Sequence, residues 1–434
     1  MNYIDNLKKF TILFLFLFQF ASVSFAQTVK FSEPRQEKLL NGMKLLVWNA
    51  PDAPKVSVKL RVHNGSAFDP QGKEGVMALL AEALFPNESQ KEFFIEDLGG
   101  SLAVTSNFDY LEINATANAE QFLTLMETLA NAVTNPQINK ETTAKVVAAR
   151  LEKVKELEKS PSYIADRAVA KKLFGDFPYG RAQMGTSASL AKIDFADLIF
   201  ARQRFLTADN ATLAIVGNVK PDLAFRVVRR FFGAWEKADK KVPATFRQPD
   251  APDTKLFSIE MPNAANGLWR SAMMTAARND KDFYATKILT EVWRNQFCYN
   301  DESKNGKSSF EPHLLSGIYV ISKNHLEELT ASARSSCEKF FVIKEGKSVY
   351  PPIGQSIFEK AKSSVIAELN QKMSTAIDST DLWLDVDTYK LVSVKDEIQK
   401  ANNVTLTDVQ RVAETLQKQP FVNVIIKNSV GTKQ

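Results

Sequence analysis

Two stretches of this sequence repeat one order of elements almost half a chain apart. Residues 193–216 begin with Ile-Asp-Phe-Ala-Asp-Leu, continue through a helical stretch and end in a mostly apolar run. Residues 404–426 begin with Val-Thr-Leu-Thr-Asp-Val and follow the same order. Asp197 and Asp408 hold the matching position, 211 residues apart. The repeat predicts a duplicated domain, so the fold must accommodate two similar halves.

The strands and helices of the first copy predict an α+β fold. Alternating apolar residues indicate strands, and longer stretches with apolar spacings of three and four indicate helices. The expected strands cover residues 44–48, 56–62, 101–106 and 110–116, and the expected helices cover residues 75–85, 119–133 and 140–158. We therefore expect two homologous α/β sandwich-like halves, each a mostly antiparallel sheet with helices packed on it.

A segment poor in apolar periodicity separates the two halves. Residues 237–255 contain Lys-Lys and three prolines, which is typical of a linker. The expected first half covers residues 27–236 and the second half covers residues 256–434. Each half is long enough to bury a core of its own.

The first 26 residues have the three parts of a secretory signal. Lys8 and Lys9 precede an apolar run at residues 10–20, and the small-residue site ends at Ala26. No later stretch approaches the roughly 20 apolar residues that a membrane helix needs, so we expect no membrane insertion after signal removal. The expected location is the periplasm, with secretion from the cell as the alternative.

Charge and cysteine content limit the ligands and covalent bonds that we expect for this chain. The chain has 55 Lys and Arg against 50 Asp and Glu, without a basic run that would indicate nucleic-acid binding. Cys298 and Cys337 are the only cysteines. An oxidising compartment would permit a disulfide between them, and two buried free thiols are the alternative.

Short motifs in a fixed order carry a resemblance to a known family. In chain order they are Asn41-Gly42, Gly65-Ser66, Gly75 to Phe85, Leu98 to Leu102, Asp109-Tyr110, Pro178-Tyr179-Gly180, Gly185, Asn210 to Gly217, and Asp280 to Tyr284. Through them the chain resembles the pitrilysin/insulinase metallopeptidases, which are inverted zincins built from duplicated α/β halves. The resemblance covers nearly all of the chain after residue 26.

The zinc motif of that family is degenerate in this sequence. The family motif is His-x-x-Glu-His in a helix, where two His one turn apart bind Zn²⁺ and the Glu activates the bound water. The matching positions here are Ala78, Ala81 and Glu82. The third ligand position falls on Arg150, with Glu152 as the alternative register. The resemblance therefore implies a non-catalytic member with no metal and no other cofactor.

The histidines and the second half offer no replacement for that site. His63, His313 and His325 have no ligand-like neighbours in sequence. The second half of family members supplies an Arg and a Tyr, seven positions apart, that hold the substrate carbonyl. Arg294 and Tyr299 are only five apart, so the resemblance does not extend to this pair.

Peptide binding is the family property that does not need zinc. Family members dock peptides on an edge strand, which here matches Ser101, Leu102, Ala103, Val104, Thr105 and Ser106. We expect this strand to be exposed and to line a cavity between the halves. Glu82 and Arg150 are expected to form an ion pair across packed helices, the alternative being that both are solvated.

Three functions follow, in order of preference. The first is a non-catalytic subunit that pairs with a zinc-bearing insulinase-family partner and helps enclose its peptide chamber. The second is an autonomous periplasmic protein that binds unfolded or short peptides or acts as a scaffold. The third is an active metallopeptidase with an atypical site.

Overall fold

The computed structural model describes most of the chain after residue 32. The described residues are 33–238, 246, 248–262, 264, 267–296, 306–323, 342–344, 347–349 and 352–428. The expected signal segment 1–26, both cysteines (Cys298 and Cys337), Tyr299 and His325 lie outside these residues, as does part of the expected linker 237–255.

The first half contains a six-stranded sheet in the described part of the chain, with the order β1-β2-β6-β3-β5-β4. β2 and β6 pair in parallel, and the other neighbours are antiparallel. The strands are β1 (Arg35–Lys38), β2 (Lys44–Asn49), β3 (Lys55–Val62), β4 (Ser101–Ser106), β5 (Leu111–Asn118) and β6 (Ala211–Gly217). All four strands expected in residues 44–116 are confirmed.

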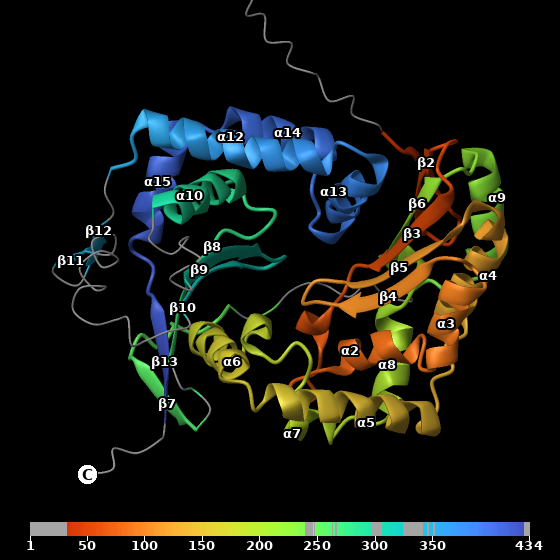
Figure 1. The fold of residues 1–434 in the computed structure, drawn as a ribbon, viewed down its shortest axis with the longest axis horizontal. Coiled ribbons are helices and arrows are strands. Elements are labelled where there is room, and N and C mark those ends of the chain that lie inside the picture. Colours follow the sequence, from red (N-terminus) through yellow and green to blue (C-terminus); the bar gives the residue numbers. More distant parts are fainter. Residues whose placement is uncertain are drawn as a thin grey trace, which may run out of the picture. The chain divides into compact units, whose positions relative to one another are not determined.

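Helices cover one face of this sheet and enclose the main core (Figure 1). They are α2 (Val76–Ala83), α3 (Glu88–Glu96), α4 (Phe122–Thr134), α5 (Lys140–Leu157), α8 (Phe195–Phe205) and α9 (Pro221–Phe232). Short α7 (Ser187–Leu190) and the 3-10 turns Ser66–Phe68, Ala119–Gln121, Pro178–Gly180 and Ala208–Asn210 connect them. Strand alternation sends Val58 and Leu60 into this core and Lys59 and Arg61 to the opposite face.

The second half has its own five-stranded sheet among the described residues, ordered β7-β13-β8-β10-β9. Only β7 and β13 are parallel in it. The strands are β7 (Phe257–Met261), β8 (Leu268–Thr275), β9 (Gly306–Pro312), β10 (Gly317–Lys323) and β13 (Val422–Asn428), beside a short ladder of β11 (Val342–Lys344) and β12 (Lys347–Val349). The helices are α10 (Phe283–Gln296), α12 (Gln355–Lys372), α13 (Ala376–Thr388), α14 (Val394–Asn403) and α15 (Leu406–Leu416). The expected α+β class with two sheets is confirmed.

The repeated sequence pattern corresponds to the same local structure in both halves. Asp194 caps α8 and Thr405 caps α15, and in each case the Asp three residues later bonds back to the capping residue's backbone N–H. Asp197 and Asp408 are therefore the second members of two capping boxes. Each helix then leads into a strand inside its sheet, β6 and β13 respectively.

In each half, one helix packs on the sheet of the other half. α6 (Pro161–Phe174) packs on β8 and β13, where Val169 and Phe174 join a core with Ala272 and Val424. In the opposite direction α13 packs on β6 and β3, and its Leu384 joins a small cluster on the first sheet. None of the described helices combines the length and apolarity needed to cross a bilayer.

Candidate functional site

The helix that carries the degenerate motif begins at a glycine held by a buried carboxylate. Gly75 has a φ of 104°, a left-handed conformation that L side chains rarely adopt. Asp69 accepts the backbone N–H of Gly75 at 2.7 Å and that of Met77 at 2.9 Å. Burial raises the pKa of Asp69 to about 7, although these two hydrogen bonds act in the opposite direction. The start of α2 is thus fixed by sequence features that do not depend on a metal.

The two alanines of the motif are part of the core. Ala78 is 4% exposed and Ala81 is 3% exposed, within a helix that is apolar on nearly every side. Neither side chain has an atom that can bind a metal. Glu82 is the polar member of the motif, and a third of its side chain reaches solvent.

Glu82 and Arg150 form the expected ion pair between α2 and α5. Nη2 of Arg150 lies 2.7 Å from Oε1 of Glu82, and its Nε donates to Oε2 at 3.3 Å. This two-point contact is the geometry in which a guanidinium binds a carboxylate most strongly. The side chain of Arg150 is only 9% exposed. Glu152, the alternative register, points outward and pairs with Lys155, so it lies away from the motif.

A cavity of about 310 Å³ adjoins this ion pair. Its lining is mostly apolar with a few charged groups, namely Ala81, Glu82, Phe85, Pro86, Glu88, Lys91, Leu102, Val104, Lys145, Val146 and Ala149. All of these residues belong to the first half. The cavity that Leu102 and Val104 line here lies between α2, α3, α5 and β4. The expected cavity between the halves stays a prediction. No local sequence pattern predicted that Lys91 and Lys145 would line this cavity.

β4 is an edge strand of the first sheet. Among the described residues it pairs with β5 alone, from Ser101 opposite Thr116 to Ser106 opposite Leu111. Its side chains alternate between exposed and half-buried, with Leu102, Val104 and Ser106 on the half-buried side. At its end the amide of Gln183 donates to the carbonyl of Ser106 at 2.8 Å. The unpaired edge of β4 thus lies beside this cavity, and the two together are called the β4 groove below.

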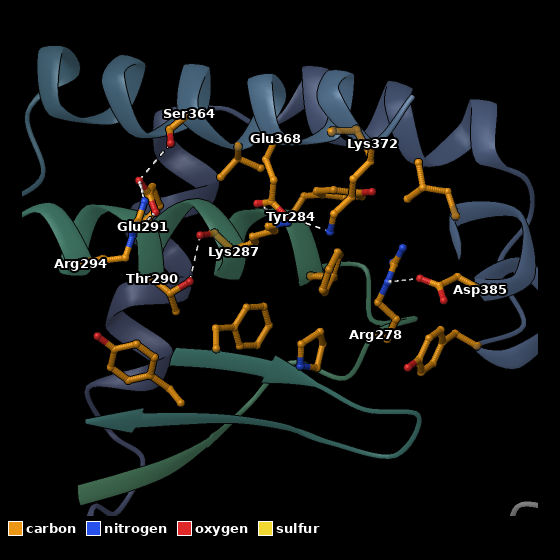
Figure 2. Close-up of a pocket in the computed structure, with 18 of the residues that line it drawn as sticks. Arg278, Tyr284, Lys287, Thr290, Glu291, Arg294, Ser364, Glu368, Lys372 and Asp385 are labelled. Carbon is orange, nitrogen blue, oxygen red and sulfur yellow. Dashed lines mark hydrogen bonds and ion pairs between the residues drawn. The ribbon is translucent and has the colours of Figure 1, made fainter. Parts of the chain in front are cut away.

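A second cavity, of about 610 Å³, lies within the second half (Figure 2). α10, α12 and α13 line it together with β9 and β10. Arg294 is one of its lining residues and donates to both oxygens of Glu291, at 2.6 and 2.7 Å. Arg294 is thus engaged with a neighbour on its own helix, while Tyr299 lies outside the described residues.

A buried carboxylate joins the two halves at the motifs Asp109-Tyr110 and Pro178-Tyr179-Gly180. Asp109 is 1% exposed and accepts the hydroxyl of Tyr179 at 3.0 Å and the backbone N–H of Leu314 at 3.2 Å. Nδ1 of His313 lies 3.1 Å from its other oxygen. Burial, together with Asp109, raises the pKa of Tyr179. The resemblance marked these motifs but did not indicate this structural role.

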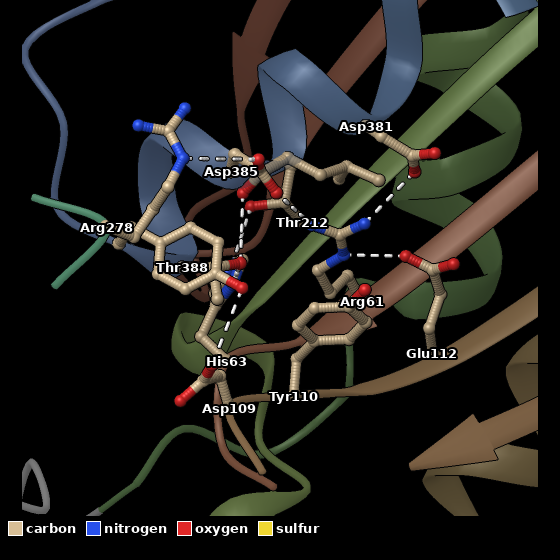
Figure 3. Close-up of polar contacts among 12 residues, drawn as sticks. Arg61, His63, Asp109, Tyr110, Glu112, Thr212, Arg278, Asp381, Asp385 and Thr388 are labelled. Carbon is tan, nitrogen blue, oxygen red and sulfur yellow. Dashed lines mark hydrogen bonds and ion pairs between the residues drawn. The ribbon is translucent and has the colours of Figure 1, made fainter. Parts of the chain in front are cut away.

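Figure 3 shows a further polar cluster where α13 meets the first sheet. Arg61, which is 1% exposed, donates to Glu112 at 2.6 Å within its own sheet, and to Asp385 at 2.8 Å and Asp381 at 3.0 Å on α13. Its guanidinium also lies 4.0 Å above the ring of Tyr110. The cluster therefore connects the halves through charge-assisted hydrogen bonds.

His63 lies in the same interface. Its Nε2 is 3.0 Å from the hydroxyl of Thr212 in the first half, and its Nδ1 is 3.0 Å from the hydroxyl of Thr388 on α13. The same two hydroxyls donate to other acceptors, that of Thr212 to Asp387 at 2.9 Å and that of Thr388 to the carbonyl of Leu384 at 3.0 Å. Burial lowers the pKa of His63 to about 4, with Arg61 acting in the same direction and Asp387 opposing it.

Comparison with known families assigns two consecutive parts of the chain. Residues 44–187 match insulinase (peptidase family M16), and residues 192–296 match the peptidase M16 inactive domain. An uncharacterized zinc protease of Rickettsia bellii is 22% identical over 210 residues, which are 47% of this chain and 50% of that protein. The chain thus spans about half the length of the curated Rickettsia relatives that it matches.

Two solved structures share the fold over nearly the whole chain. A protease from Helicobacter pylori has a TM-score of 0.79 at 15% identity, with 91% of this chain and 100% of that chain covered. A peptidase M16 inactive domain from Pseudomonas fluorescens has a TM-score of 0.77 at 18% identity, with coverage of 92% and 100%. At sequence identities of 15% and 18%, the similarity to these two structures shows a shared fold alone.

Proposed function

Because the chain belongs to the insulinase family, peptidase family M16, we propose that it is a non-catalytic member that binds peptides and pairs with a zinc-bearing relative. The ion pair between Glu82 and Arg150 is the observation that carries the proposal. In the register that the resemblance implies, the pair occupies two of the positions at which family members hold zinc. Each of the two side chains is engaged by the other.

The residues at the motif do not fit a zinc ion. Ala78 and Ala81 offer no ligand atom, and the guanidinium of Arg150 places a positive charge where a third ligand would be needed. In the described part of the chain, no three His, Cys, Asp or Glu side chains come together as metal ligands would. Without a metal or a general base at these positions, peptide cleavage would have to be supplied by another chain.

Peptide binding is supported by the edge of β4 and its cavity. An extended peptide bonds to an exposed edge through backbone groups alone, and alternate side chains then enter neighbouring pockets. Leu102 and Val104 present such a pocket on one side of β4, and charged side chains of both signs line its border, where Lys91 pairs with Glu88 at 2.7 Å. This groove supports binding of an unfolded or short peptide and needs no metal.

The partner role rests on the idea that one chain binds the peptide and a second, zinc-bearing chain cleaves it. A chain that keeps a peptide groove and lacks zinc ligands is suited to enclose the chamber of an active subunit. The second candidate, an autonomous peptide-binding or scaffolding protein, is favoured by the fact that one half contains the whole groove. The periplasm is the proposed location for either function, on the basis of residues 1–26, and N-terminal sequencing of cell fractions tests it.

The partner proposal is tested by isolating the tagged chain from its native cells. The expected result is co-purification of a protein with an intact His-x-x-Glu-His motif, and peptide cleavage by the complex but not by the purified chain. Recovery of the chain alone, with peptide binding retained, would favour the autonomous function. Cleavage by the chain alone would overturn both proposals and support an atypical peptidase site.

Docking at β4 has a test with a matched control. Val104→Glu places a charge in the cavity, whereas Thr105→Glu places the same charge on the exposed face of the same strand. Peptide affinity, measured by fluorescence anisotropy, should fall about tenfold or more for Val104→Glu and little for Thr105→Glu. Equal effects of the two changes would argue against docking in this groove.

A further inference from the structure

The cavity of about 610 Å³ in the second half has no role in the function proposed above. Its volume lies within the range of about 300 to 1,000 Å³ that is typical of small-molecule sites. Apolar side chains form one part of its lining, including Phe283, Phe310, Tyr319, Val365, Leu369 and Leu382. Charged side chains form the other part, namely Arg278, Lys287, Glu291, Arg294, Glu368, Lys372 and Asp385.

One carboxylate in this cavity forms ion pairs with two ammonium groups. Oε2 of Glu368 lies 2.9 Å from Nζ of Lys287, and Oε1 lies 2.9 Å from Nζ of Lys372. The three side chains therefore carry a net charge of about +1 at pH 7. Burial lowers the pKa of Lys287. Burial acts to raise the pKa of Glu368, but the two lysines outweigh it and the pKa is lowered.

The other charges of the cavity are already paired, Arg294 with Glu291 inside it and Arg278 and Asp385 with residues outside its lining. Arg278 donates to Glu397 at 2.6 Å, and Asp385 accepts from Arg61 at 2.8 Å. The excess positive charge is therefore located at the pair of lysines around Glu368. Figure 2 shows Glu368 and Lys372 projecting from α12 toward α10.

The position of Lys372 suits an incoming anion. Half of its side chain is exposed, and it shares its carboxylate with the more buried Lys287. An anion bound beside it would neutralise the excess charge without breaking a contact of Arg278. A single negative charge matches the excess, whereas a dianion such as a phosphate monoester would exceed it.

The remainder of the cavity suits an apolar group. The rings of Phe283 and Phe310 lie 5.9 Å apart, and the guanidinium of Arg278 lies 4.3 Å above the ring of Phe283. The hydroxyl of Ser308 also lines the cavity, is buried and finds no hydrogen-bond partner among the described residues. It is a polar contact that a ligand atom would satisfy.

We propose that this cavity binds small amphipathic carboxylates, in which one carboxylate is attached to an apolar group about the size of a phenylalanine side chain. The carboxylate pairs with Lys372, and the apolar group packs on Phe283, Phe310 and Leu369. A free aromatic acid and the C-terminal residue of a peptide share this chemistry. The site uses residues of the second half only, so it does not depend on peptide docking at β4.

Calorimetric titration of the purified chain tests the proposal with N-acetylphenylalanine and its amide. The acid should bind about tenfold or more tightly than the amide. Lys372→Gln should bring the acid and the amide close to equal affinity. Lys360→Gln removes the same charge from an exposed position on the same helix outside the cavity, and it should leave the preference unchanged.

Two further probes distinguish the sources of the carboxylate. Binding of a short peptide that ends in phenylalanine, but not of the free acid, would support a site for peptide ends, and equal binding would support a site for small acids. The proposal is overturned if acid and amide bind equally, if Lys372→Gln and Lys360→Gln act alike, or if inorganic phosphate binds more tightly than the acid.

Discussion

Removing either partner of the Glu82–Arg150 pair should destabilise the protein unequally, because the two side chains differ in exposure. The side chain of Arg150 is 9% exposed and that of Glu82 is 34% exposed. Glu82→Met leaves a nearly buried guanidinium without its carboxylate, at a cost of about 3 kcal/mol. Arg150→Met leaves a carboxylate that still reaches water through the cavity, and the cost should be about 1 kcal/mol.

The double variant isolates the interaction itself. Two methionines in place of the pair leave no buried charge, so the double change should cost about 1 to 2 kcal/mol, less than the single changes combined. The coupling energy would then be about 2 to 3 kcal/mol. Urea unfolding followed by circular dichroism gives each free energy of unfolding.

The control for this cycle is the exposed Glu152–Lys155 pair on the same helix. We expect no resolvable coupling there, because both side chains are largely solvated. Two results would refute the account of the pair as a buried charge with a partly solvated partner. One is that the costs of the single changes at Glu82 and Arg150 are additive. The other is that Arg150→Met costs more than Glu82→Met.

Three other predictions concern the interface and the edge strand. The pKa of His63 is lowered from an ordinary 6.5 to about 4, so the folded state binds fewer protons than the unfolded state between these pH values. Stability should therefore fall by about 2.6 kcal/mol as the pH decreases from 6.5 to 4. His63→Gln should remove that part of the pH dependence, and an unchanged difference between the two proteins across this pH range would contradict it. Asp109→Asn should cost about 2 kcal/mol in urea unfolding, because a neutral amide oxygen accepts from the hydroxyl of Tyr179 and the backbone N–H of Leu314 less strongly than a carboxylate does. A cost near zero would be contrary evidence. Gly100→Ala would place a Cβ 1.8 Å from the carbonyl oxygen of Thr116, so β4 should separate from β5. The backbone amides of β4 should then exchange faster in hydrogen-exchange experiments, and unchanged exchange would refute this expectation.

The fold was largely predictable because its signals are local. The apolar run of β2, the alternation in β3 to β5 and the turn at Gly99 and Gly100 all lie within short stretches of sequence. The match between Asp197 and Asp408 had a local physical cause as well, since each residue completes a capping box. The ion pair of Glu82 and Arg150 was predictable only through the resemblance, which identified two distant positions as neighbours.

Contacts between the halves were not predictable from such local signals. The apolar face of α6 shows that the helix must pack against something, but not that it packs on β8 and β13 of the other half. The same applies to α13, whose carboxylates at Asp381 and Asp385 meet Arg61 more than 300 residues away. Nor does the sequence near Leu102 indicate that its cavity lies within the first half.

The zinc content of the purified chain tests the central claim most directly. The protein should be purified without chelators, equilibrated with zinc, passed through gel filtration and measured by plasma mass spectrometry. We expect well below one zinc per chain, because Ala78 and Ala81 have no ligand atoms and Arg150 holds Glu82. One tightly bound zinc per chain, lost on Glu82→Gln or Glu152→Gln, would contradict the account.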